Sequence, residues 1–79
     1  ILSSGAVVEA GAQVIDSVIM PGARVEPGAV VRRAIVAENA RVGRSAQVGE
    51  ETGLIAVVGQ GAVVPDGAVV KAGEQFGEG

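Results

Sequence analysis

The sequence contains no cysteine, histidine, tryptophan or tyrosine, and its only aromatic residue is Phe76. Without cysteine there is no disulfide framework and no thiolate nucleophile. Without histidine there is no imidazole to act as a general base, to ligate zinc or to activate a serine. We therefore expect that this segment alone catalyses nothing and holds no cofactor or metal ion of its own.

Charge and length narrow the function further. The 79 residues carry 6 basic and 9 acidic side chains, a net charge of −3, whereas nucleic-acid binding needs a basic surface. No apolar run approaches the length of about 18 residues that spans a bilayer, and no signal-peptide pattern is present. We expect one small domain with no nucleic-acid or membrane partner, in a cytoplasmic setting with which the lack of cysteine is compatible.

What the chain does have is a short repeated phrase, Gly-Ala-x-Val, usually repeated every six residues. The phrase begins at Gly5, Gly11, Gly22, Gly28, Gly61 and Gly67, and with the glycine replaced at Asn39 and Ser45. So short a period is typical of a β-solenoid, in which one short strand and one corner form the unit. A β-sandwich or a low-complexity segment is the alternative, but neither would keep inward and outward positions in phase over the whole chain.

The last residue of each phrase is predicted to point inward. A small residue stands two positions earlier and therefore on the same face of the strand. The predicted inward aliphatic and aromatic residues are Leu2, Val8, Val14, Ile19, Val25, Val31, Val36, Val42, Val48, Val58, Val64, Val70 and Phe76.

The spacing of these residues predicts how the chain winds. Steps are six residues, except that Val14 to Ile19 and Val31 to Val36 are five. Three strands then close one triangular coil of about 17 or 18 residues, and stacked coils are joined by parallel strand pairing. The predicted fold is an all-β, three-sided parallel β-helix of about four coils. Its three columns begin at Leu2, Val8 and Val14.

The residue before each inward aliphatic is predicted to face outward. In one column these residues are Ile1, Val18, Ile35 and Val57. Contiguous apolar surface usually marks a contact with another chain or domain, so Val18, Ile35 and Val57 are our candidate interface. The competing interpretation is that branched residues simply favour strands, whichever way they face.

A second outward column carries Arg24 and Arg41, one coil apart. We interpret this pair as a candidate anion or effector contact, or as the rim of an interface. The simpler interpretation is two solvated arginines.

The third corner of the coil is irregular. Val48 and Val58 are ten residues apart, which predicts a loop at Gly49–Gly53 that is pushed out of the corner. Charged residues fall at successive levels of the same corner and predict a ladder of exposed ion pairs that tunes the register. They are Asp16, Arg32, Arg33, Glu50 and Glu51.

Two stretches carry a resemblance to a known family. They are Asp16-Ser17-Val18-Ile19-Met20-Pro21-Gly22-Ala23-Arg24-Val25 and Gly28-Ala29-Val30-Val31-Arg32-Arg33-Ala34-Ile35-Val36. They resemble the C-terminal left-handed β-helix of sugar-nucleotide pyrophosphorylases, especially the glucose-1-phosphate adenylyltransferase (ADP-glucose pyrophosphorylase) family. A later segment, Ile55-Ala56-Val57-Val58-Gly59, resembles the point where the coils of that family resume after the insertion.

The resemblance implies a left-handed hexapeptide-repeat β-helix over residues 1–79 and an N-terminal nucleotidyltransferase domain before Ile1. A start at Ile1, already in phase with the repeat, is what we expect of a fragment of a longer chain. The missing domain would hold Mg²⁺ and convert ATP and glucose 1-phosphate into ADP-glucose and pyrophosphate for glycogen synthesis. The β-helix would pack on that domain, build the homo-oligomer and take part in allosteric regulation. No catalytic residue can be carried over.

Other functions stay open at this point. The chain is alternatively a fragment of a hexapeptide-repeat acyltransferase whose histidine lies in other sequence, or a ligand-free structural solenoid. Within the resembling family, guanylyl- and thymidylyltransferases with similar tails, and a non-catalytic regulatory paralogue, are also compatible with these residues.

Overall fold

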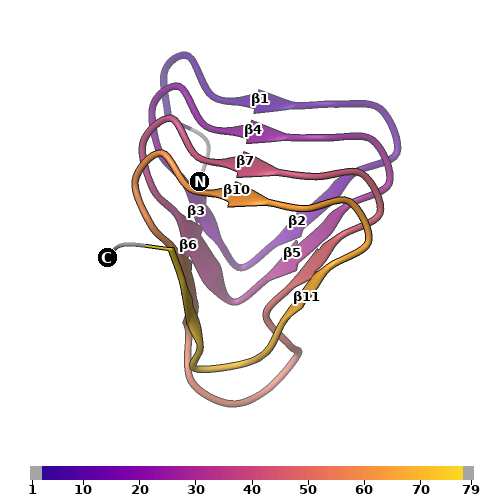
Figure 1. The fold of residues 1–79 in the computed structure, drawn as a ribbon, viewed down its shortest axis with the longest axis vertical. Helices are drawn as coiled ribbons and strands as arrows, with labels where there is room; N and C mark the ends of the chain where they lie inside the picture. The colour runs from indigo at the N-terminus through magenta and orange to yellow at the C-terminus, as the bar shows by residue number, and fades with distance from the viewer. Residues whose placement is uncertain (1–2, 78–79) are drawn as a thin grey trace.

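The computed structural model describes residues 3–77, which wind into a three-sided prism (Figure 1). Each side is a four-stranded parallel sheet, so the described residues make four stacked coils. The strands are β1 (Val7–Val8), β2 (Gln13–Ile15), β3 (Val18–Ile19), β4 (Arg24–Val25), β5 (Val30–Arg32), β6 (Ala34–Val36), β7 (Arg41–Val42), β8 (Gln47–Val48), β9 (Ala56–Val58), β10 (Val63–Val64), β11 (Val69–Val70) and β12 (Gln75–Phe76).

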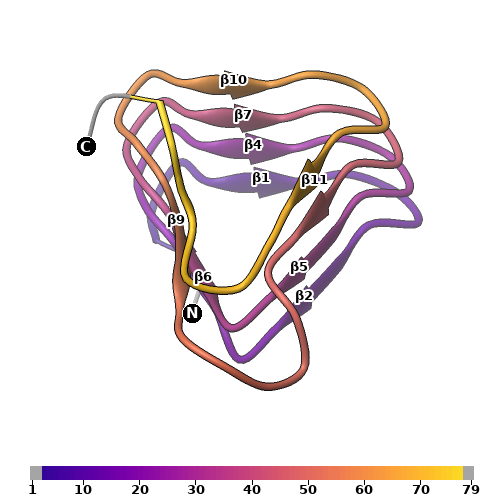
Figure 2. The same ribbon diagram turned by 60° about the horizontal axis from the view of Figure 1, so that its bottom comes forward.

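Successive strands belong to successive sheets. Sheet I contains β1, β4, β7 and β10; sheet II contains β2, β5, β8 and β11; sheet III contains β3, β6, β9 and β12. In Figure 2 the C-terminal coil lies nearest the viewer and runs clockwise from β10 through β11. A chain that turns clockwise while it approaches the viewer is a left-handed coil. The predicted left-handed parallel β-helix of about four coils is therefore confirmed.

The register of the strands confirms the predicted columns. In sheet III, Ile19 lies opposite Val36, Val36 opposite Val58, and Val58 opposite Phe76. The columns that begin at Val8 and Val14 pair in the same way through all four coils. The predicted first member of the remaining column, Leu2, lies outside the described residues, as does Ile1.

The interior is built almost entirely from valine and alanine. The inward valines of the two middle coils are fully buried, and the alanines two positions before them are buried at the vertices because only a small side chain fits there. The buried apolar residues are Ile19, Ala23, Val25, Ala29, Val31, Ala34, Val36, Ala40, Val42, Ala46, Val48, Ala56, Val58, Val64 and Val70.

The corners turn through left-handed backbone. The residue before each vertex alanine is mostly glycine, which adopts positive φ without strain. Asn39 takes this role at φ 60 and Ser45 at φ 58. At the two five-residue steps the residue before the vertex is not glycine. Asp16, at φ 48, and Arg33, at φ 45, adopt left-handed backbone there, because these shorter corners have one residue fewer in which to turn.

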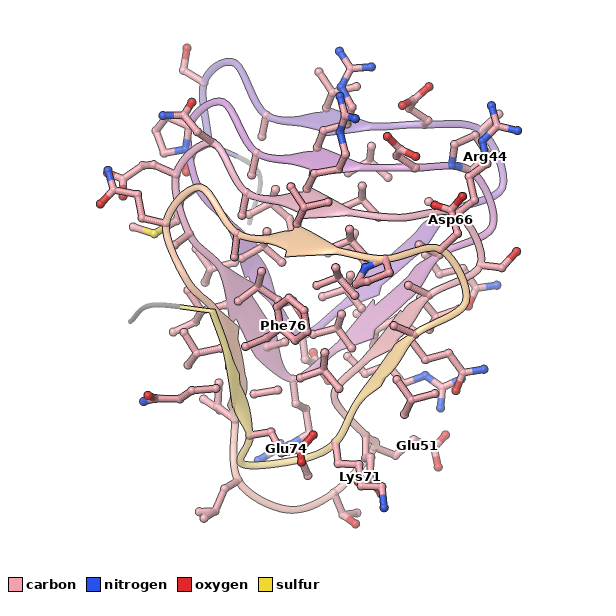
Figure 3. The ribbon with its side chains drawn as sticks, in the orientation of Figure 1. Arg44, Glu51, Asp66, Lys71, Glu74 and Phe76 are labelled. Carbon is pink, nitrogen blue, oxygen red and sulfur yellow. The ribbon has the colours of Figure 1, made fainter. Side chains whose placement is uncertain are left out.

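The two ends of the prism differ. At the C-terminal end the ring of Phe76 lies inside the triangle and packs against the core (Figure 3). Val64 and Val70, in the last coil, are therefore 0% and 2% exposed. Val8 and Val14, in the first described coil, are only half-buried. Within residues 3–77 there is no long apolar helix of the kind that crosses a bilayer.

Inward and outward positions of neighbouring strands should contribute very differently to the unfolding free energy. Val42→Ala removes two methyl groups from a side chain that is 0% exposed, and should cost about 2 kcal/mol of unfolding free energy. Val63→Ala, at an outward position of the same sheet that is 57% exposed, should change it by less than about 0.5 kcal/mol. Chemical denaturation of both variants measures the difference, and equal effects would contradict the assignment of faces.

Candidate functional site

Val18, Ile35 and Val57 stand in register on the outer face of sheet III. Val18 lies opposite Ile35, and Ile35 opposite Val57. Each is half-buried, because neighbours above and below shield its sides while its outer end meets solvent. These three residues, here called the apolar stripe, are followed in the last coil by Gln75.

The other two sheets have no comparable outer face. Among residues 3–77, only sheet III presents apolar side chains outward in three successive coils. The outward column of sheet I is Val7, Arg24, Arg41 and Val63, and that of sheet II is Gln13, Val30, Gln47 and Val69. Branched residues occur outward in all three sheets, so β-propensity explains single positions but not their continuity in sheet III.

The loop before β9 adds exposed apolar side chains at one end of the stripe. Leu54 is 78% exposed and Ile55 is 50% exposed. Ile55 is two residues before Val57 and so lies on the same side of the strand. Sequence reasoning missed these two residues because it ended the loop at Gly53 and assigned Ile55 to the resumed coil.

Arg24 and Arg41 lie opposite each other on sheet I, as predicted. Each contacts a glutamate of the preceding coil: Arg24 Nη1 is 3.2 Å from Glu9 Oε2, and Arg41 Nε is 3.1 Å from Glu26 Oε2. Both arginine side chains remain about half exposed, at 46% and 54%. The glutamates were missed, although an acidic residue 15 positions before each arginine is a signal visible in the sequence.

The irregular corner does not form the ladder of ion pairs that the sequence predicted. Within residues 3–77 the ion pairs are the two on sheet I, and none joins charged residues of this corner. The side chains instead surround a hollow of about 250 Å³ lined by Ile15, Asp16, Arg32, Arg33 and Glu51. The prediction failed because residues at successive levels of a corner line the same hollow without their charged ends coming within ion-pair distance.

The insertion runs from Gly49 to Ile55 and bulges out of the triangular outline (Figures 1 and 2). Hydrogen bonds hold it to neighbouring coils, among them the N–H of Gly49 to the carbonyl oxygen of Val70 over 2.7 Å. Arg33 Nη2 donates to the carbonyl oxygen of Gly53 over 3.2 Å. The carbonyl oxygen of Leu54 accepts from the N–H of Gly73 over 2.9 Å, and Glu50 Oε2 accepts from the N–H of Ala72 over 3.0 Å.

Ser17 and Asp66 have structural partners. The buried hydroxyl of Ser17 donates to the carbonyl oxygen of Ile15 over 2.7 Å and accepts from the N–H of Ala34 over 3.1 Å. The carboxylate of Asp66 accepts from the backbone N–H of Arg44 over 2.9 Å, at a corner visible in Figure 3. No cluster of acidic side chains suited to a metal ion occurs in residues 3–77.

A left-handed parallel β-helix with this repeated phrase at its corners belongs to the class of hexapeptide-repeat β-helix domains. The comparison with family models gives the family within that class. Residues 1–74 match the model of the GMPPB C-terminal domain, and the chain belongs to this family of sugar-nucleotide pyrophosphorylase C-terminal domains. Neither the curated proteins nor the solved structures include a significant match to the chain.

Gly49, where the insertion leaves the coil, should tolerate no side chain. It adopts φ +81, and a Cβ there would overlap the carbonyl oxygen of Arg32. Gly67 is the matched control, since it adopts φ +72 with no atom within 4 Å of a Cβ. Both alanine variants carry the cost of left-handed backbone, about 1–2 kcal/mol. Gly49→Ala should lose about 1–3 kcal/mol more in a denaturation experiment because of the overlap, and equal losses would contradict the close approach.

Proposed function

We propose that the chain is the assembly and regulatory domain of a sugar-nucleotide pyrophosphorylase, non-catalytic by itself, and that the apolar stripe is its main contact surface. The observation that supports this most directly is the alignment of Val18, Ile35 and Val57 in three successive coils. A flat row of apolar side chains on a rigid sheet is well suited to contact a second flat surface, because little side-chain freedom is lost on binding.

The surroundings of the stripe resemble those of protein interfaces. Such interfaces have an apolar centre with few charged residues and a polar rim. Here the centre is the stripe, extended by Ile55, and Gln75 lies at its C-terminal end. The partner we propose is a second copy of the full protein, together with the N-terminal catalytic domain of the same chain.

Arg24 and Arg41 are proposed as the rim of that assembly or as a contact for an anionic effector. Exposed ion pairs contribute only about 0–1 kcal/mol. Their glutamate partners can therefore be exchanged for an anion or for the acidic side chain of another subunit at small cost. Without such a partner, each guanidinium group is paired with one glutamate, Arg24 with Glu9 and Arg41 with Glu26.

The reaction we propose for the whole protein is the transfer of a nucleotide to a sugar 1-phosphate in the cytoplasm, catalysed with Mg²⁺ by the N-terminal domain. The specific proposal is ATP with glucose 1-phosphate, giving ADP-glucose and pyrophosphate for glycogen synthesis; a guanylyl or thymidylyl donor is the alternative. An acyltransferase fragment is disfavoured because the family match covers residues 1–74 and the chain has no histidine. A ligand-free solenoid does not account for the apolar stripe.

If the apolar stripe is the assembly contact, a charged side chain placed on it should dissociate the oligomer. Ile35→Glu should lower the mass of the full-length protein in light scattering, because it buries a carboxylate in the contact. Val30→Glu is the matched control: Val30 is also half-buried and outward, but its neighbours in register are Gln13 and Gln47. Circular dichroism checks that both variants fold. A wild-type monomer, or equal masses for the two folded variants, would contradict assembly through the stripe.

The nucleotide specificity is tested on the full-length protein by pyrophosphate release. ATP, GTP and dTTP are each supplied with Mg²⁺ and a panel of sugar 1-phosphates. We expect turnover with ATP and glucose 1-phosphate at least about tenfold faster in kcat/KM than with any other pair, a difference of about 1.4 kcal/mol in transition-state binding. A clear preference for GTP or dTTP would reject the adenylyl assignment and retain the pyrophosphorylase, whereas no release with any pair would favour a regulatory paralogue.

A further inference from the structure

The corner between sheets II and III carries charges whose sign alternates from coil to coil. The first coil has one carboxylate there, the second has two guanidinium groups, the third has two carboxylates, and the fourth has one ammonium group. In this order the residues are Asp16, Arg32 and Arg33, Glu50 and Glu51, and Lys71. All are exposed except Arg32, which is half-buried. This row, here called the charged edge, runs along one edge of the prism directly beside the apolar stripe.

The charged edge is not neutralised within the chain. Neighbouring levels have opposite signs, yet the two ion pairs of residues 3–77 both lie on sheet I. Arg33 and Glu50 form hydrogen bonds with backbone groups only. Glu74, at the level of Lys71, is turned back on its own corner, where Oε1 accepts from the backbone N–H of Lys71 over 2.7 Å. The side chain of Lys71 points out of the last coil at this corner (Figure 3). These charges are therefore available to a second chain.

The order of signs along the charged edge is complementary to its own reverse. From the first coil to the fourth it is negative, positive, negative, positive, so a copy whose helix axis is reversed presents positive, negative, positive, negative. A two-fold axis that is parallel to the strands and lies midway between the second and third coils sets every level against a level of opposite sign. It brings Asp16 next to Lys71 of the second copy, and Arg33 next to Glu51 of the second copy. A contact of this kind is isologous, because each copy contributes the same surface.

The same two-fold axis brings the outer faces of the two sheets III together. Ile35 of each copy then lies against Val57 of the other, and these residues form the apolar centre of the contact. Val18 lies against Gln75 at the two ends of the contact. The charged edges of the two copies meet along one side of this centre, as the polar rim of an interface does.

Other ways of joining the two sheets are disfavoured by charge. A two-fold axis at the level of Ile35 would set Arg33 against its own copy and Asp16 against Glu51. Like charges placed opposite each other are strongly unfavourable, whereas the midway axis gives up only apolar contact at the ends of the stripe. If the helix axes were parallel, the charged edge would meet the opposite edge of sheet III. Glu38 is the only charged residue at that edge within residues 3–77.

We propose that two copies of the chain associate antiparallel through their sheets III, and that the charged edge fixes the level at which they meet. The occupant of the stripe in this contact is a second copy of the same chain. The inference rests on the assembly role proposed above and adds the direction and the register of the contact. Complementary charges are suited to this task, because they discriminate between registers more than they add affinity.

The register is tested by zero-length carbodiimide cross-linking of the full-length protein, with the products mapped by mass spectrometry. Lys71 is the only lysine among the 79 residues. We expect an amide bond between Asp16 and Lys71 in the cross-linked dimer. The bond must join two copies, because in one chain the two residues lie three coils apart, roughly 14 Å, which is farther than both side chains reach. Its absence from protein that light scattering shows to be assembled would overturn the proposed register.

Charge reversal tests the same pairing without chemistry. Lys71→Glu sets two carboxylates against each other at two symmetric places and should raise the dissociation constant at least about tenfold in analytical ultracentrifugation. Asp16→Lys should act alike, and Arg33 shows that a long basic residue is accommodated at this left-handed position. The double variant restores opposite charges and should return the constant to within about threefold of wild type. Arg44→Glu is the control, since it reverses an exposed charge at the corner between sheets I and II.

The outcomes separate this inference from the assembly role itself. If Ile35→Glu dissociates the protein but Lys71→Glu weakens it no more than Arg44→Glu, the stripe is the contact and the antiparallel register is overturned. If the double variant is as weak as Lys71→Glu, the pairing with Asp16 is overturned. If Ile35→Glu leaves the assembly intact and no cross-link forms, both proposals fail. Circular dichroism confirms for each variant that the β-helix is folded.

Discussion

The structure depends on one constraint, the fixed register of each coil on the next. Side chains alternate between the two faces of a strand, so a slip of one residue would turn a whole row of inward valines out into water. A corner must therefore turn the chain into the next sheet while keeping the inward residues in phase, and left-handed backbone makes this turn in a short stretch of chain. The phrase Gly-Ala-x-Val follows directly: glycine turns the corner, alanine fits the vertex, and valine fills the core. The x position points outward and varies most, between valine, arginine and glutamine in the eight phrases.

The same constraint explains how the chain accommodates five additional residues between Val48 and Val58, which are ten residues apart where the two preceding steps at this corner are five. Because they cannot enter the stack, they leave it at Gly49, where only glycine fits against the carbonyl oxygen of Arg32. They return at Ala56, opposite Ala34, in unbroken register. The hydrogen bonds of Glu50, Gly53 and Leu54 to neighbouring coils then replace the ladder that the excluded residues would otherwise make. The loop is thus attached to the stack by hydrogen bonds, although its backbone lies outside the triangular outline of the coils.

This constraint also decides what the sequence could predict. Inward columns, vertices and the start of the insertion follow from alternation and counting, and the structure confirms them within residues 3–77. The partners of long side chains do not follow, because they depend on rotamers and on which level of a corner each chain leans toward. Arg24 and Arg41 were placed correctly but their contacts with Glu9 and Glu26 were not foreseen, and the charges around Arg32 were predicted to pair when they surround a hollow. Phe76 was predicted to point inward. The sequence did not indicate that its ring closes one end of the prism.

The irregular features lie together on one part of the molecule. Both five-residue steps, the insertion and the hollow occur at the single corner that leads into sheet III, and the apolar stripe begins two residues past that corner at Val18. The corners of sheets I and II keep the six-residue spacing. Regular coils are sufficient for folding, so departures that cost backbone strain at Asp16 and Arg33 need a compensating role.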